Sequence, residues 1–499
     1  MKRILSALLG ISVAATMAVG LTGCDMAAGN DKLVWYCVGE KPTDHELVME
    51  EVNKIVEPEL GLKLDIQYID DASFTEKTKL MMSSNEPYDL VFTGYVNNYQ
   101  PAVEMGGLLD ITDMMENITM KDGTKVKMSD VVEDYFLESA YVDGRIYGIP
   151  NTQVISNPQC LEMPKRVAEA TGFDYEKLDQ MGRNNDSYET MVALLDAYTE
   201  ELAKIKAMEN TDLGYKYTMK PYNPATYNIY ESIAGGTAIR KDGTSDEIVI
   251  LQDTEEWKYG VKTVRKWYEL GYIRNDMASA AAMESSDSDN MYATTVGTWK
   301  PGQEIYYINQ NGEEPVYAFH GDPYVGRTSA LATMISVNAR SAHPEEAVKM
   351  IYMLNSNEEL FNLIVWGIEG KNYKRNEDGT AKEIEGYEKI AQNAWKYGNQ
   401  FKGYVMEGQP ADVWEQTKQM NDTAIKSPVL GFVPDTTSIS AEIANISAVE
   451  QEYKAYRNYG VAPFEDWYDE YRAKLKAAGI ETVRDEIQKQ YDAWKAEQN

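Results

Sequence analysis

Beyond residue 31, short apolar runs alternate with amphipathic stretches, and this order constrains the fold more than any other feature of the chain. Lys32–Val38 is an apolar run typical of a buried strand. Residues 62–68 alternate apolar and polar side chains, and residues 89–92 form another apolar run, which predicts two more strands. Two helices are predicted between the three strands. A β-α-β-α-β order of this kind folds as a parallel sheet with right-handed crossovers, so an α/β protein is predicted.

The two helices have recognisable ends and apolar faces. Thr43 is predicted to be the N-cap of the first, with Glu46 reaching back to it in a capping box. Pro58 and Gly61 are expected to end that helix. The apolar residues that mark the faces are Leu47, Val48, Val52, Ile55 and Val56 in the first helix and Phe74, Leu80 and Met81 in the second.

The loops after the three strands carry polar and aromatic side chains. Ligands of open parallel sheets bind outside the carboxyl ends of the strands, so a binding site is predicted there. Its candidate residues are Glu40, Tyr95, Asn97 and Tyr99. Amides and phenols can bond to ligand hydroxyls, and rings can stack on a ligand face. Packing within the loop is the alternative for the last three, and a solvated turn is the alternative for Glu40.

The remainder of the chain shows no internal repeat and no low-complexity segment. Its predicted elements are a helix near Met114, a turn and possible interlobe strand at 142–150, helices at 191–205 and 257–270, a strand and loop at 291–302, a strand at 330–337, a helix at 343–354, and a helical layer from Trp467 onward.

The first 24 residues have the pattern of a bacterial lipoprotein signal. Lys2 and Arg3 precede an uncharged apolar run, Ile4–Leu21, which is too rich in small residues for a good membrane-spanning helix. Leu21–Cys24 resembles the lipobox, in which a peptidase cuts before the cysteine and the thiol carries a diacylglycerol. We therefore expect a lipid on Cys24, held in the membrane by about 0.8 kcal/mol for each buried methylene. An ordinary cleaved signal with a coincidental cysteine is the alternative.

The chain is strongly acidic. Its formal charge is −32, and because residues 1–23 hold two basic and no acidic residues, the rest carries −34. Nucleic-acid binding depends on Lys and Arg that neutralise phosphates, so no nucleic-acid partner is expected. Cys37 and Cys160 are expected to be two separate buried thiols, with a disulfide as the alternative.

Signatures of catalysis or metal binding are missing from the sequence. Only three histidines occur, and no metalloprotease, nucleophile-elbow, dinucleotide or phosphate-loop motif is found. We therefore expect no catalytic residue, no cofactor and no bound metal. Asp287–Asn290 hints at calcium but lacks the glycine and closing glutamate of an EF loop, so a surface turn is predicted.

Several blocks resemble extracellular solute-binding proteins of ABC importers, family 1. Besides the lipobox, the blocks that carry the resemblance are Leu33–Gly39, Asn85–Gly94, Gly106–Asp113 and Asp143–Pro150. Later blocks narrow it to the LipO-like branch with a DUF3502-type C-terminal extension: Trp366–Tyr373, Trp395–Phe401 and Ser427–Phe432. The resemblance covers nearly the whole chain beyond the signal, and the order and spacing of the blocks make it specific.

The resemblance implies an α/β, two-lobe periplasmic-binding-protein-like (type II) fold, with a ligand cleft between the lobes and a helical C-terminal extension. It implies no reaction. It implies binding of a carbohydrate, commonly an oligosaccharide, hinge closure around it, and delivery to ABC importer permease subunits. Together with Cys24, it predicts a monomer anchored by lipid to the outer face of the cell membrane. The abundance of Tyr, 35 residues against 9 Phe, also suits a hydroxyl-rich ligand.

The expected domain organisation follows from the elements and the resemblance together. It consists of a signal peptide at 1–23, a lipidated tether at 24–31, lobe 1 at 32–148, lobe 2 at 149–324, a return to lobe 1 at 325–372, and completion of lobe 2 with the C-terminal helical extension at 373–499.

Further cleft residues are predicted from loops and family blocks. Trp299 lies between Gly297 and Pro301, where a large ring has little local reason to be buried, so a stacking platform is predicted. Trp366 and Glu369 flank Gly367 at the end of a helix and are both candidates for ligand contact, since Glu369 could accept two sugar hydroxyls. A helix C-cap with a packed tryptophan is the alternative. The remaining candidates are Lys300, Trp395 and Asn399, the last two taken from a family block alone.

Other functions stay open at this point. A secreted glycoside hydrolase needs two carboxylates about 5 to 9.5 Å apart, and among 80 acidic residues some pair will satisfy this by chance. A surface interaction protein without transport is a third possibility, and a peptide or another small solute is the alternative ligand.

Overall fold

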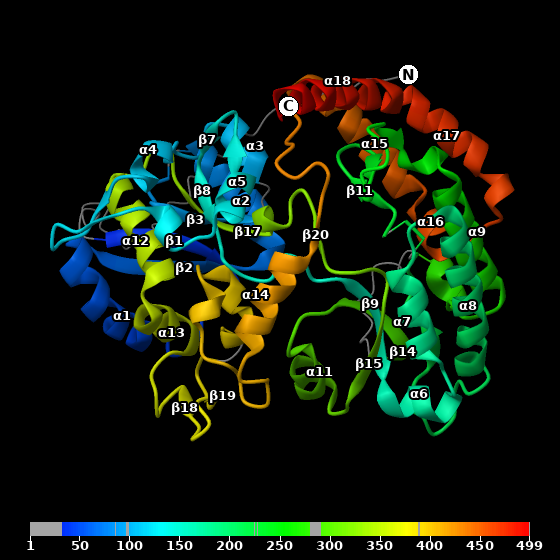
Figure 1. Cartoon of the computed structure of the whole chain (residues 1–499), viewed down its shortest axis with the longest axis horizontal. Coiled ribbons are helices and arrows are strands. Elements are labelled where there is room, and N and C mark those ends of the chain that lie inside the picture. The colour runs from blue at the N-terminus through cyan, green and yellow to red at the C-terminus, as the bar shows by residue number, and fades with distance from the viewer. Residues whose placement is uncertain are drawn as a thin grey trace, which may run out of the picture.

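The computed structural model describes residues 32–498 except 85, 96–98, 224, 227, 280–290 and 388–389. Two α/β lobes stand side by side, and the C-terminal helices arch over the second one (Figure 1). The signal, Cys24, the tether, Asn97 and Asp287–Asn290 lie outside the described residues, so the expectations for them stay predictions. Among the described helices, none is both long enough and apolar enough to cross a membrane.

Lobe 1 is built on the predicted parallel sheet. β1 (Lys32–Val38) pairs in parallel with both β2 (Lys63–Ile69) and β3 (Leu90–Gly94), which confirms the β-α-β-α-β unit. β17 (Thr333–Val337) is antiparallel to β3 and to β8 (Gly148–Pro150) and completes the order β2-β1-β3-β17-β8. The strand predicted at 330–337 therefore does return to the first lobe.

The first helix, α1 (His45–Leu60), starts differently from the prediction. It has no side-chain cap, so the capping box between Thr43 and Glu46 is wrong. Glu46 instead pairs with Lys41, 2.5 Å away in the preceding turn, and this ion pair removes its side chain from the helix start. Pro58 lies inside the last turn of the helix rather than ending it, and its missing N–H costs the helix one hydrogen bond, to the carbonyl of Lys54 in the preceding turn.

The inward faces of α1 and of α2 (Asp71–Ser84) are narrower than predicted. Leu47 is 40% exposed and Leu80 is 67% exposed, so neither belongs to the core. Leu47 lies between the buried residues His45 and Val48, and because successive helical residues are about 100° apart it is turned toward solvent. The predicted residues that do pack inward are Val48, Val52, Val56, Phe74 and Met81. The helices α12 (Pro344–Ser356) and α13 (Glu358–Trp366) pack against α1.

Lobe 2 has a four-stranded sheet in the order β10-β14-β9-β15, formed by Tyr217–Met219, Tyr292–Thr298, Gln159–Pro164 and Pro315–Phe319. One face of this sheet is apolar and packs on helices that include α8 and α9, close to the two amphipathic stretches predicted here. The helices of lobe 2 are α6 (Lys165–Thr171), α7 (Tyr175–Arg183), α8 (Tyr188–Lys206), α9 (Glu255–Glu269) and α11 (Gln303–Asn311).

The C-terminal helices form a third core beside lobe 2, which confirms the predicted helical layer. Aromatic side chains from Trp467 and Tyr471 pack with Trp257 of α9 in this core. Its elements are the sheet β11-β12-β13 (Tyr230–Ser232, Thr237–Arg240, Val249–Ile250) and the helices α15 (Ser440–Glu452), α16 (Lys454–Tyr459), α17 (Tyr468–Ala477) and α18 (Ile480–Gln498).

Three segments connect the lobes and are tied to one another. β16 (Tyr324–Val325) pairs in parallel with β20 (Ile425–Lys426). Glu231 of β11 accepts hydrogen bonds from the Tyr324 hydroxyl at 2.7 Å and from the Ser427 hydroxyl at 2.5 Å. The third segment, residues 151–158, is bonded through Ser156 to the backbone N–H of Tyr324. The connection is therefore a compact hinge.

The core of lobe 1 extends further along the chain than expected. The predicted return ended at residue 372, whereas Tyr373, Tyr397 and Met406 are buried in the same cluster as β1. The chain leaves lobe 1 only at β20. Residues 373–406 have short two-stranded and single-turn elements, so no long periodic pattern marks them as part of this core.

Both remaining cysteines are buried free thiols, as predicted. Cys37 lies on β1 in lobe 1 and Cys160 on β9 in lobe 2, so the two thiols are in different lobes. Burial raises the pKa of each thiol, which keeps both protonated at neutral pH.

Candidate functional site

A cavity of about 470 Å³ lies at the carboxyl ends of β1, β2 and β3, where the sequence predicted a site. Glu40 and Lys41 line it from the loop after β1, and Asp71 lines it from the start of α2. Tyr95 after β3 and Trp395 from a distant segment also line it, together with Tyr68 and Tyr397. Carboxylate, ammonium and aromatic groups thus converge at one edge of the sheet.

Tyr95 and Trp395 present an aromatic surface in this cavity. Their rings meet edge to face, with centroids 5.8 Å apart. The Tyr95 hydroxyl donates a hydrogen bond to Asp71 Oδ1 at 2.5 Å, which fixes the ring although the side chain is 49% exposed. Burial is the main cause that raises the pKa of Tyr95, and the hydrogen bond to the Asp71 carboxylate raises it further. The phenol therefore stays neutral and able to donate.

Lys396 adds a positive charge at the floor of the same cavity. Its Nζ donates a hydrogen bond to the Val38 carbonyl at 3.3 Å and lies 5.0 Å from the Trp395 ring centroid. Burial lowers the pKa of Lys396, and the charge of Asp71 opposes that shift. The Lys396 ammonium group therefore contacts both the end of β1, through the Val38 carbonyl, and the Trp395 ring.

Gly94 is needed to bring Tyr95 to this place. It has φ of 148°, in the region that favours glycine, and it ends β3 beside the 3-10 turn at Ala332. A Cβ at this position would lie 2.1 Å from the Ala332 carbonyl oxygen. The close approach lets the Tyr95 N–H bond to that same oxygen at 2.9 Å.

Lobe 2 presents a second aromatic group at the carboxyl ends of β14 and β15. The Trp299 ring meets the Phe319 ring edge to face at 5.5 Å, and its Nε1 donates a hydrogen bond to Glu304 Oε1 at 2.8 Å. Trp299 is half-buried. The next residue after Phe319, His320, lines a cavity of about 200 Å³, and burial lowers its pKa to about 3, so its ring is neutral.

One crossing segment joins the two aromatic groups. The Asn151 side chain donates a hydrogen bond to the Trp395 carbonyl at 3.1 Å, and the Pro158 carbonyl accepts one from the Trp299 N–H at 3.0 Å. Pro158 lies seven positions after Asn151, so the backbones of these two residues are within about 25 Å of each other even if the segment is fully extended. An oligosaccharide of a few rings could reach both tryptophans.

Two of the predicted contacts lie in the core instead. Tyr99 is 3% exposed, and its hydroxyl donates to the Ala140 carbonyl at 2.9 Å and accepts from the Tyr147 N–H at 2.8 Å. Trp366 is 3% exposed and packs on Tyr373 at 5.8 Å. Both placements favour the packing alternative over ligand contact, because the lobe's own side chains cover the rings.

Two more predicted residues lie outside the cavity. Asn399 is buried and its side chain accepts a hydrogen bond from the Phe401 N–H at 3.0 Å, which caps a short 3-10 turn. Glu369 is exposed just after α13. Glu40, Tyr95 and Trp395 are thus the predicted residues that line the lobe 1 cavity, and Trp299 lies at the matching edge of lobe 2.

Lys300 follows Trp299 and carries a testable electrostatic feature. Its Nζ lies 4.9 Å from the Tyr306 ring centroid, and burial lowers its pKa to about 8. The ordinary pKa of lysine is about 10.4, so between pH 8 and 10.4 the unfolded chain binds more protons and stability rises with pH. We expect Lys300→Met to raise the free energy of unfolding at pH 7 by at most about 3 kcal/mol, and this gain to vanish above pH 10.5.

Urea unfolding from pH 7 to pH 11 measures that effect. The matched control is Lys79→Met, on the exposed face of α2. A stability difference that stays constant over the whole pH range would show that the charged form of Lys300 carries no burial cost.

The sequence missed several residues of the site. Lys396 and Asn393 line the lobe 1 cavity from a segment without long helices or strands. Phe319 could have been found, because residues 315–319 form a short apolar run of strand length, and Phe319 ends that strand.

Comparisons with known proteins agree with this architecture. Residues 428–496 match a family model described as a domain of unknown function, DUF3502. The chain is 26% identical over 492 residues, 95% of both sequences, to a carbohydrate ABC transporter substrate-binding protein of Streptococcus pneumoniae serotype 4 (strain ATCC BAA-334 / TIGR4).

Solved structures show the same fold. The N-glycan transport solute binding protein NgtS of Streptococcus pneumoniae superposes with a TM-score of 0.77 at 23% identity, over 94% of this chain and 100% of that one. The substrate binding protein FusA of S. pneumoniae, in complex with kestose, gives a TM-score of 0.57 at 14% identity, over 94% and 100%. These neighbours confirm the predicted two-lobe α/β fold. Over nearly its whole length the chain is therefore similar to a substrate-binding protein of a carbohydrate ABC transporter, and its C-terminal residues match the DUF3502 model.

Proposed function

We propose that the protein binds a carbohydrate, an oligosaccharide of a few rings, in the cleft between its lobes and delivers it to the permease of an ABC importer. The observation that carries the proposal is the position of Trp395 and Trp299, one at the binding edge of each sheet and both bonded to the segment 151–158. Flat rings on both lobes let a sugar contact both at once, and only such shared contacts favour the closed form.

The polar groups of the cavity suit hydroxyl ligands. Asp71 and Glu40 offer carboxylate oxygens that accept from hydroxyls, while Lys41 and the amide of Asn393 donate. With Lys396 included, the cavity lining holds two carboxylates and two ammonium groups, so a neutral solute is favoured over a strongly charged one. Relatives agree in kind: NgtS has been crystallised with Man1GlcNAc and with Man5GlcNAc, and FusA with kestose.

Isothermal titration against a panel of oligosaccharides, followed by chromatography of the recovered sugar, tests the proposal. We expect at least one member to bind with the sugar recovered unchanged, since we propose that the protein is not an enzyme. Cleaved sugar would instead establish a glycoside hydrolase. Binding of peptides but of no sugar would show that the ligand is a peptide and not a carbohydrate. Binding of neither peptides nor sugars would overturn the proposal.

We also propose that Cys24 carries the lipid anchor and that the protein acts as a monomer on the outer face of the membrane. Cys24→Ala is expected to release the protein into the medium without changing its sugar affinity, because the tether only raises the local concentration near the permease. Cell fractionation and titration of the released protein measure the two effects. An altered affinity would show that the tether and the cleft are not independent.

A further inference from the structure

Another cavity, of about 240 Å³, lies in lobe 2 beside the face of the sheet opposite most of its apolar core, although Val167, Tyr215 and Ala293 of that core also reach its lining. Leu161 and Met163 of β9 belong to that core, so Glu162 between them points to the other face. Thr295 of β14 and Tyr317 of β15 lie directly across from Glu162 on the neighbouring strands. A carboxylate, a hydroxyl and a phenol therefore share this face.

The helix α11 encloses the cavity from the other side. Gln303, Tyr307 and Gln310 of α11 line it, yet no residue of this helix is buried. A helix that covers a sheet normally buries an apolar stripe against it, and α11 does not. The space between α11 and the sheet is thus polar and unfilled rather than a packed core.

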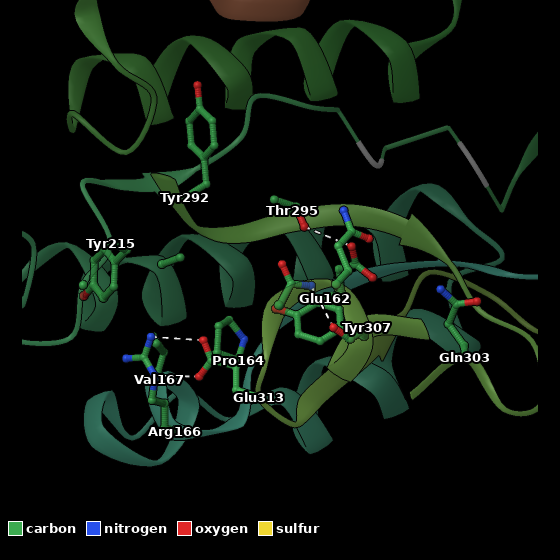
Figure 2. A pocket seen from close by; sticks show the side chains of 14 residues that line it. Glu162, Pro164, Arg166, Val167, Tyr215, Tyr292, Thr295, Gln303, Tyr307 and Glu313 are labelled. Carbon is green, nitrogen blue, oxygen red and sulfur yellow. Dashed lines mark hydrogen bonds and ion pairs between the residues drawn. The ribbon is translucent and has the colours of Figure 1, made fainter. Parts of the chain in front are cut away.

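The side chains of the sheet are arranged around this space. Glu162 Oε1 accepts a hydrogen bond from Thr295 Oγ1 at 3.1 Å. Gly297 leaves room for the carboxylate, because a Cβ there would lie 2.7 Å from Glu162 Oε2. Figure 2 shows Glu162 and Thr295 together at the centre of the cavity, with Tyr307 near them. Close by, the hydroxyl of Tyr317 is buried and, within the part of the chain that the structure describes, has no hydrogen-bond partner.

Charge and size limit the ligand. Arg166 lines the cavity, but Glu313 neutralises it through an ion pair of 2.6 Å, also visible in Figure 2. The carboxylate of Glu162 then disfavours anions. Amides and hydroxyls both donate and accept, which matches a ligand whose own groups do the same. The volume is below the range of about 300 to 1,000 Å³ for drug-sized ligands.

We propose that this cavity is a second binding site, separate from the cleft, for an uncharged polyhydroxy ligand of the size of one sugar ring. It goes beyond oligosaccharide uptake, because a ligand here would contact lobe 2 alone. The Glu162 carboxylate would accept from two ligand hydroxyls, and the amides of Gln303 and Gln310 would bond to the others.

Saturation-transfer NMR with D-glucose, D-mannose and N-acetyl-D-glucosamine tests this site on the full chain carrying Trp299→Ala and Trp395→Ala. Those two changes are made to remove sugar binding in the cleft. Binding that remains in this variant is therefore assigned to the cavity, and the two proposals are tested separately. We expect at least one of the three sugars to bind with a millimolar Kd. Adding Glu162→Gln with Thr295→Val is expected to weaken that binding at least tenfold.

Two further variants keep the test decisive. Gln303→Ala with Gln310→Ala changes only side chains of α11 that are not buried, so it reports on the cavity even if the sheet variant fails to fold. Glu314→Gln, whose carboxylate pairs with Lys165 outside the cavity, is the matched control and is expected to leave binding unchanged. Absence of binding by all three sugars, binding unaffected by both cavity variants, or capture of choline in their place would overturn the proposal.

Discussion

Replacing Trp299 and Trp395 together by alanine is expected to weaken oligosaccharide binding about 1,000-fold, and each single replacement about 30-fold. Buried aromatic anchors at binding sites contribute about 2 kcal/mol or more each, and 1.4 kcal/mol is a factor of ten in Kd. Because the two rings belong to different lobes, the double variant removes an anchor from each side of the cleft. Isothermal titration with the best sugar of the panel measures the change.

The controls separate ring stacking from damage to the fold. Trp494→Ala removes a half-buried tryptophan of α18 that packs on Phe432 and Tyr491, far from the cleft lining, and is expected to leave the affinity unchanged. Trp395→Phe keeps a flat ring and is expected to recover much of the lost affinity. Single variants that each bind within twofold of the parent would exclude the two tryptophans as sugar platforms.

Asn421→Ala is expected to lower the free energy of unfolding by about 3 kcal/mol or more, the largest stability change that we predict. The Asn421 side chain is 2% exposed, accepts hydrogen bonds from the Ile155 N–H at 3.0 Å and the Ser156 hydroxyl at 2.9 Å, and donates one to the Gln153 carbonyl at 2.8 Å. Alanine leaves these three buried groups without a partner, at about 1 to 3 kcal/mol for each. Urea unfolding, followed by tryptophan fluorescence, measures the loss.

Two further variants on the same helix, α14 (Val413–Thr423), bracket this effect. Gln419→Ala changes an exposed side chain and is expected to alter stability by less than about 0.5 kcal/mol. Asn421→Asp keeps both acceptor contacts but cannot donate to Gln153, so an intermediate loss is expected. An Asn421→Ala protein as stable as the Gln419→Ala protein would show that the stability of the segment 151–158 does not depend on this side chain.

Helices and strands whose apolar residues recur with a regular period could be predicted from the sequence, and segments without such a period could not. The strands of lobe 1 and the helices α8 and α9 were placed from their apolar patterns, because these patterns reflect burial on one local face. Residues 373–406 join the core of lobe 1 through scattered side chains such as Tyr387 and Tyr397, and their short turns give no period to read. Lys396 reaches the cavity from this same segment, so it could not be foreseen.

Two expectations drawn from local patterns were wrong for different reasons. The capping box at Thr43 and Glu46 fits the local pattern, but the neighbouring Lys41 forms an ion pair with Glu46 instead. The lobe boundary near residue 372 fits the end of α13, but the chain stays in lobe 1 to β20. The first case is a competition between nearby side chains, and only the second depends on contacts between distant segments.

What the sequence determined by itself was the edge of the sheet at which the candidate cavity lies, since the order of strands and helices fixes where the carboxyl ends of parallel strands meet. Which aromatic side chains face that edge was decided only by the tertiary structure. Tyr95 and Tyr99 follow the same strand, yet Tyr95 is 49% exposed beside Trp395 while Tyr99 is 3% exposed in the core. The physical reason is that a loop has no fixed period, so the direction of each side chain depends on what distant segments place around it.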